Sequence, residues 1–278
     1  MIFSGMNSTK GFWARASQFA ALFIAACIFL PAAFGQQSDS HKSGKLKTAA
    51  KEPVKKDVPM PFRIGETLNY EVAWATFSTA ASVQLSVPER RELSGWGTWH
   101  FRATAHTESP VRTLFTIDDQ FDSYTDAATL ESRQFEMYLD ELGRKQNQTF
   151  HFVAQGQPAP GGVPVVIVLP GTRDPLGALY ALRSVDWPHT QELRAPLYDG
   201  RNLYELHAHM EAASDPVEIA AGKFSATKIS LRLFQNSKEV SGTKFTAWLA
   251  NDVARTPVLL EGELPLGTVH VELTSLPK

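Results

Sequence analysis

The sequence predicts a mainly β fold, an antiparallel sheet that curls or closes part-way into a half-open barrel around one short amphipathic helix. Three observations support this prediction. Apolar and polar residues alternate with a period of two over most of the chain after residue 60. Turn-forming residues separate the alternating stretches at short intervals. One segment, at about residues 174–186, departs from the pattern and follows the helical period.

The first expected strand shows the alternation clearly. Within residues 66–75, apolar side chains at every second position alternate with polar or small ones: Leu68, Tyr70, Val72 and Trp74. The same pattern recurs in residues 81–87, 97–106, 223–234, 243–251 and 267–276. Such alternation is typical of strands with one buried and one wetter face. Turn signals such as Ser94-Gly95 and Asp199-Gly200 lie between these segments, so we expect about a dozen antiparallel strands.

The exceptional segment carries the signals of a helix N-terminus. Asp174 can cap the helix, and Pro175 suits its first position. The side chains that follow at i, i+3, i+4 and i+7 are Leu176, Leu179, Tyr180 and Arg183. We expect the helix to end near Trp187-Pro188. A single amphipathic helix in a sheet protein should plug or cap the concave side of the sheet, with its leucines and Tyr180 toward the strands.

Residues 1–35 are predicted to be a secretory signal peptide. Two basic residues precede an apolar run at 19–30, and small residues then offer a cleavage site near Gly35. The run is shorter than the ~20 residues that span a bilayer. We therefore expect export to the periplasm or cell envelope and no transmembrane span in the mature chain. The alternatives are a retained anchor and a lipoprotein that is acylated at Cys27.

Residues 36–60 are predicted to be a disordered linker rich in Lys, Ser and Pro. The segment has almost no large apolar residue, so it cannot bury enough surface to offset the entropy lost on ordering. We favour a flexible spacer; the alternative is a basic strap against anionic lipid or cell-wall polymer. Residues 61–278 are then predicted to form a single β-rich domain, which is long enough to be held by its core alone.

This expected domain is acidic. Residues 61–278 hold 19 basic and 26 acidic side chains, a net charge of −7. An acidic body repels phosphate backbones, and no stripe of basic and aromatic residues offsets the repulsion. The sequence therefore argues against nucleic acid as a partner.

Five motifs follow one another along the expected domain. They are Phe62-x-x-Gly65-Glu66-x-Leu68-x-Tyr70-x-Val72-x-Trp74, Phe115-Thr-Ile-Asp118-Asp119-x-Phe121-x-Ser123, the capped helix from Asp174 to Arg183, Gly222-Lys-Phe224-x-Ala226-x-Lys228-Ile229, and Trp248-Leu249-x-x-Asp252-x-x-x-Thr256-Pro257-Val258. Together they resemble the bacterial family named domain of unknown function 3108. The resemblance implies an exported, mostly β protein of the Gram-negative envelope, with no established activity. It also implies a sheet similar to the half-open barrels of periplasmic lipoprotein carriers, which is an analogy of fold alone.

The densest carboxylate cluster comprises Asp118, Asp119, Asp122 and Asp126. Hard cations prefer oxygen ligands, but the spacing lacks the mid-loop Gly and the terminal Glu of a calcium loop. We therefore expect a solvated strand end in which Asp118 or Asp119 caps a turn, with a cation site as the alternative.

A second candidate site lies on an expected strand, where one face carries Glu205, His207, His209 and Glu211. Two imidazoles at i and i+2 with flanking carboxylates could hold zinc, which makes His207 and His209 candidate metal ligands. The competing interpretation is the polar face of a half-exposed strand. The sequence contains no G-x-S-x-G, P-loop or dinucleotide motif, so it assigns no catalytic residue and no cofactor.

The aromatic residues give the remaining hint. Core packing explains them most simply, and the alternative is that some of them line an apolar pocket inside the curled sheet. The candidate lining residues are Trp74, Trp99, Leu179, Tyr180, Trp248 and, as a polar gate, Arg183.

Three functions follow from these patterns. The preferred hypothesis is a non-catalytic exported envelope protein that binds a lipid or other apolar envelope-derived ligand, or a protein partner, in the curled sheet. The second is a periplasmic metal-dependent hydrolase that uses His207 and His209. The third is a structural envelope protein whose sheet edge pairs with another chain.

Overall fold

The computed structural model describes residues 59–157, 162–264 and 267–276. The predicted signal peptide, the alternative lipid attachment at Cys27 and the predicted linker up to residue 58 lie outside the described residues. Within the described ranges, no helix is long and apolar enough to cross a membrane.

Fourteen strands form one sheet. The first half comprises β1 (Thr67–Trp74), β2 (Phe77–Leu93), β3 (Trp96–Thr107), β4 (Asp118–Asp126), β5 (Ser132–Glu141), β6 (Arg144–Ala154) and β7 (Val165–Val168). The second half comprises β8 (Glu192–Tyr198), β9 (Leu203–Ile219), β10 (Gly222–Gln235), β11 (Lys238–Glu239), β12 (Lys244–Ala250), β13 (Pro257–Leu264) and β14 (Gly267–Ser275). The helical elements are η1 (Val111–Thr113), α2 (Pro175–Ser184) and α3 (Trp187–Thr190).

The strand order explains the curl of the sheet. It runs β7-β6-β5-β4-β3-β2-β1-β14-β13-β12-β10-β9-β8. The first and last strands in the sequence, β1 and β14, therefore pair at the centre of the sheet. All neighbours are antiparallel except β6 and β7. The edge strands β7 and β8 do not pair with each other, so the described sheet stays open as a half-barrel. The predicted mainly β, curled and largely antiparallel fold is confirmed.

A short segment between β7 and α2 reaches across the open seam. The amide of Ser132 donates to the carbonyl of Thr172 at 3.0 Å, and the amide of Arg173 donates to Pro196 of β8, also at 3.0 Å. Aromatic contacts add to this link, because the ring of Tyr198 lies 5.8 Å from that of Phe150 on β6. The two edges are therefore held together without a continuous ladder.

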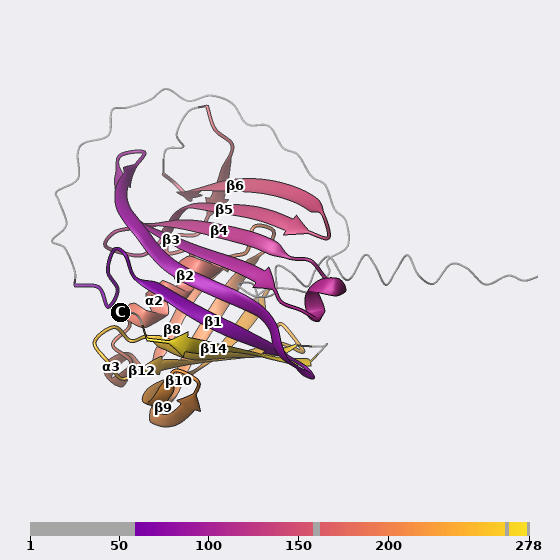
Figure 1. Ribbon diagram of the computed structural model, residues 1–278. Coiled ribbons are helices and arrows are strands. Elements are labelled where there is room, and N and C mark those ends of the chain that lie inside the picture. Colours follow the sequence, from indigo (N-terminus) through magenta and orange to yellow (C-terminus); the bar gives the residue numbers. More distant parts are fainter. Residues whose placement is uncertain (1–58, 158–161, 265–266, 277–278) are drawn as a thin grey trace, which may run out of the picture.

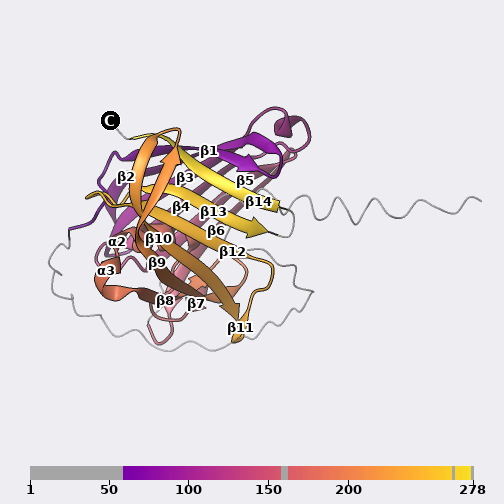
Figure 2. The ribbon, with the colours of Figure 1, turned by 90° about the horizontal axis from the view of Figure 1, so that it is seen from below.

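Helix α2 lies inside the curl, as predicted. Figures 1 and 2 show α2 and α3 at the same end of the sheet, with α2 between the half formed by β1–β6 and the half formed by β8–β14. Leu176 and Tyr180 face the strands and are buried, whereas Leu179 is partly buried. The helix is shorter than expected: it ends at Ser184 because Val185 is extended. Trp187-Pro188, expected to end this helix, instead begins the short α3, since proline suits a first helical turn.

Candidate functional site

The concave face of the half-barrel has two ends that differ in chemistry. We call the end around α2 the plugged end; it includes Phe62, Trp99, Tyr180 and Arg183. We call the opposite end the mouth. It comprises the inward-facing residues at the other strand ends: Trp74, Asp119, Glu141 and Leu264. Antiparallel pairing places them at the same end, since β1 finishes beside the start of β14, and β4 starts beside the finish of β5.

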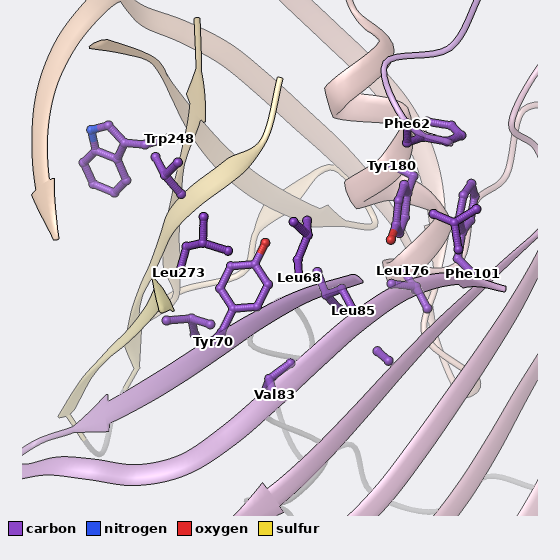
Figure 3. Packing of buried hydrophobic residues seen from close by; sticks show 14 of the residues in the cluster. Phe62, Leu68, Tyr70, Val83, Leu85, Phe101, Leu176, Tyr180, Trp248 and Leu273 are labelled. Atoms are coloured by element: carbon purple, nitrogen blue, oxygen red, sulfur yellow. The ribbon is translucent and has the colours of Figure 1, made fainter. Parts of the chain in front are cut away.

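Aromatic rings fill the plugged end. The ring of Tyr180 stacks on Phe101, with centroids 3.7 Å apart and planes 6° apart. Phe62 meets Trp99, Phe101 and Tyr180 edge-on at 5.1–5.2 Å. Figure 3 shows Phe62, Tyr180 and Phe101 gathered beside α2. The indole nitrogen of Trp99 and the hydroxyl of Tyr180 are buried without a hydrogen-bond partner among the described residues.

A buried ion pair lies beside these rings. Arg183 is 1% exposed and holds Glu66 through two hydrogen bonds, of 2.6 and 3.0 Å. It also donates to the carbonyl of Ala254 at 3.0 Å, while Arg255 donates to the carbonyl of Arg183 at 3.2 Å. Burial acts to lower the pKa of Arg183, but the hydrogen bonds and charge of Glu66 outweigh it, so the pKa is raised. Arg183 is therefore fully charged, and it fastens the last turn of α2.

The first turn of α2 is fastened as well. Asp174 caps the helix by accepting from the amide of Gly177 at 2.8 Å, and its other oxygen accepts from the hydroxyls of Ser123 and Ser132. Burial raises the pKa of Asp174. Gly177 lets α2 approach β4 closely, because a Cβ at this position would lie 2.9 Å from a methyl carbon of Thr125. Helix α2 is therefore a plug fixed at both ends.

Apolar side chains at the mouth are less completely covered. Trp74, Met137, Leu139, Phe150 and Leu264 pack against the core clusters but are only partly buried. The ring of Trp74 stacks with Phe77, with centroids 6.3 Å apart. The helical element at this end is the three-residue η1 between β3 and β4, and the turn at Gly200 lies against Phe150 and Met137. The mouth thus offers accessible apolar surface that faces the interior.

Two acidic residues interrupt the apolar mouth. Asp119 is 3% exposed, and Glu141 is partly buried. Burial raises the pKa of Asp119 to about 6. Burial, together with the nearby charge of Asp119, raises the pKa of Glu141 to about 7. Perturbed carboxyls of this kind are common at binding sites.

The predicted pocket residues do not all meet. Trp99, Tyr180 and Arg183 lie together at the plugged end, whereas Trp74 lies at the mouth. Trp248 is 8% exposed and belongs to the same buried cluster as Tyr180, but it lies on the face of β12 opposite to Ala247. Its indole nitrogen donates to Asp215 of β9 at 2.8 Å. Figure 3 shows Trp248 on the far side of Leu273 and Tyr70 from Tyr180.

The two histidines proposed as metal ligands have different partners. His207 contacts Glu205 at 2.8 Å and stacks on Phe234. His209 lies 3.6 Å from Glu192. Across the described ranges there is no group of three or more His, Cys, Asp or Glu residues that could hold a metal ion.

The four aspartates of the carboxylate cluster also separate. Asp118 pairs with Arg112 and His106, and these hydrogen bonds and charges lower its pKa despite partial burial. Asp122 is buried and bonds His100, Arg102 and Gln120. The expected turn cap is neither Asp118 nor Asp119 but Asp126, which accepts from two successive amides of the following turn at 3.0 Å each. The segment is therefore a largely buried strand rather than a solvated strand end.

A polar groove of about 690 Å³ lies on the outer face of β1, β2 and β3. Its acidic lining residues are Glu71 and Glu108, and Ser82 donates to Glu108 at 2.9 Å. Sequence patterns do not indicate this groove, because polar residues on the outer face of a strand look alike whether the face is flat or hollowed. The same patterns indicate no role for Glu66 or Glu141, whose neighbours are distant in the sequence.

The chain resembles known proteins in family and fold. A family model described as protein of unknown function (DUF3108) matches residues 69–274. Among solved structures, the chain resembles a β-barrel-like protein of the DUF1849 domain from Brucella abortus. The TM-score is 0.50 and the identity 11%, covering 76% of this chain and 96% of that one. This likeness concerns the fold alone. A search of the curated proteins finds no match.

Two weaker likenesses involve other solved structures. One is an inferred lipoprotein from Parabacteroides distasonis, with TM-score 0.38 and 12% identity, covering 78% of this chain and 97% of that one. The other is an inferred exported protein with a YmcC-like fold from Bacteroides fragilis, with TM-score 0.37 and 14% identity, covering 79% of this chain and 98% of that one.

Proposed function

The chain belongs to the DUF3108 family of proteins of unknown function, and we propose that it is an exported envelope protein. It binds an apolar ligand, such as a lipid chain, at the mouth of its half-barrel. The signal-like residues 1–35 support export, with cleavage near Gly35. Residues 36–60 would then tether a β-rich domain that comprises residues 61–278. We assign this domain a binding role and no catalytic residue.

One observation carries the proposal, namely the different burial of inward-facing apolar side chains at the two ends. At the plugged end they are buried beneath a helix that is fastened at both termini. At the mouth, Trp74, Leu264 and their neighbours remain partly exposed while facing the interior. Ligand sites are concave, mostly apolar and largely pre-formed, which describes the mouth better than the plugged end.

Binding can be tested with a neutral apolar dye. The chain is purified from its own envelope, stripped of bound lipid and titrated with phenylnaphthylamine, whose fluorescence rises in apolar surroundings. We expect saturable binding that weakens about tenfold or more in Leu264→Asp, because a charge at the mouth opposes the apolar dye. Trp74→Ala should weaken binding less.

The matched control is Val253→Asp, since Val253 is 95% exposed in the loop before β13. It introduces the same charge outside the mouth and should leave dye binding unchanged. An equal loss in both variants, or no saturable binding by the parent chain, would remove the proposal. Native mass spectrometry of the unstripped protein provides a second readout, a co-purifying apolar molecule that Leu264→Asp no longer retains.

A second candidate function rests on the edge strand β7. Ile167 is 61% exposed on this edge, and Val163 and Leu169 near it are also exposed. An exposed apolar edge strand can pair with a strand of another envelope protein. Ile167→Lys would abolish such pairing while leaving dye binding at the mouth unchanged, so crosslinking of the parent and the variant in the envelope separates the two functions.

A further inference from the structure

The strongest unexplained feature of the mouth is the carboxylate of Asp119. One oxygen accepts from the backbone amide of Asp140 at 2.9 Å. The other is buried without a hydrogen-bond partner among the described residues. Register places Asp119 on the concave face, because Phe121, two residues further along β4, packs in the core there. An unpaired carboxylate oxygen in such a place is expensive to bury and needs a partner.

Glu141 lies on the same face of the neighbouring strand. The regular pairing of β4 with β5 starts at Gln120 opposite Tyr138, and an isolated bridge joins Ile117 to Glu141. Asp119 and Glu141 are therefore diagonal neighbours, a spacing of roughly 7–8 Å between backbone positions. Side chains of this length can reach one point between them.

The charges around the pair are mixed. Asp118 and Asp140, beside Asp119 on β4 and β5, raise its pKa, and Asp119 in turn raises that of Glu141. Arg201, from the turn between β8 and β9, acts in the opposite direction on Glu141. Asp118 is paired with Arg112 and Asp140 with Lys145, which leaves Asp119 and Glu141 as the mutually repelling carboxylates on the concave face. An additional cation between these two would relieve their repulsion.

We propose that Asp119 and Glu141 form a head-group site, which binds the protonated amine of an amphiphilic ligand whose apolar chain lies along the mouth. This inference rests on the proposed function and names the chemical class of its ligand. The amine supplies N–H donors to the unpaired oxygen of Asp119 and to Glu141, and its positive charge compensates both carboxylates. A carboxylate head group would be repelled by the same two residues.

The test compares ligands that share one chain and differ in head group. Decylamine, decanol and decanoate are each used to displace phenylnaphthylamine from the purified chain. At pH 8 we expect decylamine to bind about tenfold more tightly than decanol, the size of one charge-assisted hydrogen bond, and decanoate to bind more weakly than decanol. In Asp119→Asn and Glu141→Gln the preference for decylamine should fall severalfold, while decanol binds as before.

The dependence on pH provides a second readout. An alkylamine, like lysine, stays protonated between pH 5 and pH 8. The two carboxyls lose their protons over this range, so decylamine should bind more tightly as the pH rises, whereas decanol should not respond. Asp119→Asn should flatten the decylamine profile. The control variants Glu71→Gln and Glu108→Gln change acids of the outer groove and should alter neither the preference nor its pH profile.

Failure of this inference can be distinguished from failure of the proposed function. If decanol and the dye bind but decylamine has no advantage, or if Asp119→Asn keeps the full advantage, the head-group site is wrong and the apolar mouth stands. If neither decanol nor the dye binds, the mouth is not a ligand site and both proposals fall. Circular dichroism of each variant confirms that it has folded.

Discussion

The plugged end and the mouth use the same strands and the same alternation, yet they differ in how their buried carboxylates are satisfied. At the plugged end Arg183 has Glu66, and Asp174 has two serines and an amide. At the mouth the buried oxygen of Asp119 has no partner among the described residues. Trp99 and Tyr180 at the plugged end also lack hydrogen-bond partners within the described ranges, but their polar atoms are neutral, and a buried carboxylate oxygen without a partner costs more stability. The paired charges stabilise the plugged end, and the proposed binding role belongs to the mouth.

This difference also changes the role expected for α2. A movable lid over a ligand should be held by few and weak contacts. Instead, buried polar contacts at both ends and a glycine against β4 hold α2 in place. Under the proposed function, a ligand therefore enters through the mouth without displacing the helix.

Breaking the ion pair at the plugged end should have the largest effect. Arg183→Met leaves the Glu66 carboxylate buried without its counter-ion, so the free energy of unfolding should fall by about 3–5 kcal/mol. The double variant Glu66→Gln with Arg183→Met removes both charges and should recover much of this loss. Urea denaturation of the single and double variants measures the change.

A matched exposed pair provides the control. Lys223 and Glu218 are well exposed and 3.1 Å apart, so Lys223→Met should change stability by less than ~1 kcal/mol. If Arg183→Met were as mild as Lys223→Met, the plugged end would not be the fixed part of the molecule.

Removing the cap of α2 should have the next largest effect. Asp174→Ala leaves the amide of Gly177 and two buried serine hydroxyls without their acceptor, so we expect a loss of about 3 kcal/mol. Asp186 occupies the corresponding position before α3 but caps no amide with its side chain. Asp186→Ala should therefore change the free energy of unfolding by no more than ~0.5 kcal/mol. Equal losses in both variants would contradict the assigned role of Asp174.

Local patterns were enough to predict much of the plugged end. The spacing in residues 174–183 predicted a capped helix, and alternation in β1 predicted the inward set Leu68, Tyr70 and Val72, which are buried. The partner of Arg183 could not be predicted in this way, because Glu66 lies 117 positions earlier in the chain. Only the strand order brings such residues together.

Strand β12 shows a second limit of the sequence patterns. Alternation separated Ala247 and Leu249 from Trp248, but both faces of this strand carry apolar side chains. Period-two patterning cannot decide which of two apolar faces is the inner one. The mouth was missed for a related reason: Asp119 and Glu141 are ordinary polar residues in sequence, and they become unusual only through burial on a concave face.

Asp119 at the mouth and its neighbour Asp118 should affect the pH dependence of stability in opposite directions. Burial raises the pKa of Asp119 to about 6, so the folded state holds this proton more tightly than the unfolded state does. Its contribution to stability is present at pH 4 and is lost as the pH rises through about 6. Asp119→Asn should therefore stabilise the protein at pH 8 by about 2 kcal/mol and leave it unchanged at pH 4.

Asp118 is the internal control for this prediction. Its pKa is lowered, chiefly by the hydrogen bond from Arg112, so it stabilises the folded state above the ordinary aspartate range and loses this effect in acid. Asp118→Asn should destabilise the protein slightly at pH 8, the opposite sign to Asp119→Asn. Thermal unfolding at both pH values compares the two. If both variants moved in the same direction, Asp119 would not be the unsatisfied group that sets the mouth apart.

The smallest effect concerns the fit of α2 against the sheet. Gly177→Ala raises helix propensity by about 1 kcal/mol, but the new Cβ would lie 2.9 Å from the methyl of Thr125, so helix or strand must shift. Overpacking of this kind opposes the gain by about 1–3 kcal/mol, which leaves a net loss of about 1 kcal/mol. Thr125→Ser removes the methyl and should reduce the loss in Gly177→Ala, although the Asp174 and Ser132 oxygens remain 3.2 Å from the new Cβ; a double-mutant cycle in urea measures the reduction. Dye binding should be unchanged in all three variants, because the clash lies at the plugged end. A variant that altered dye affinity without altering stability would show that the position of the helix controls the mouth, and the two ends would then act as one site.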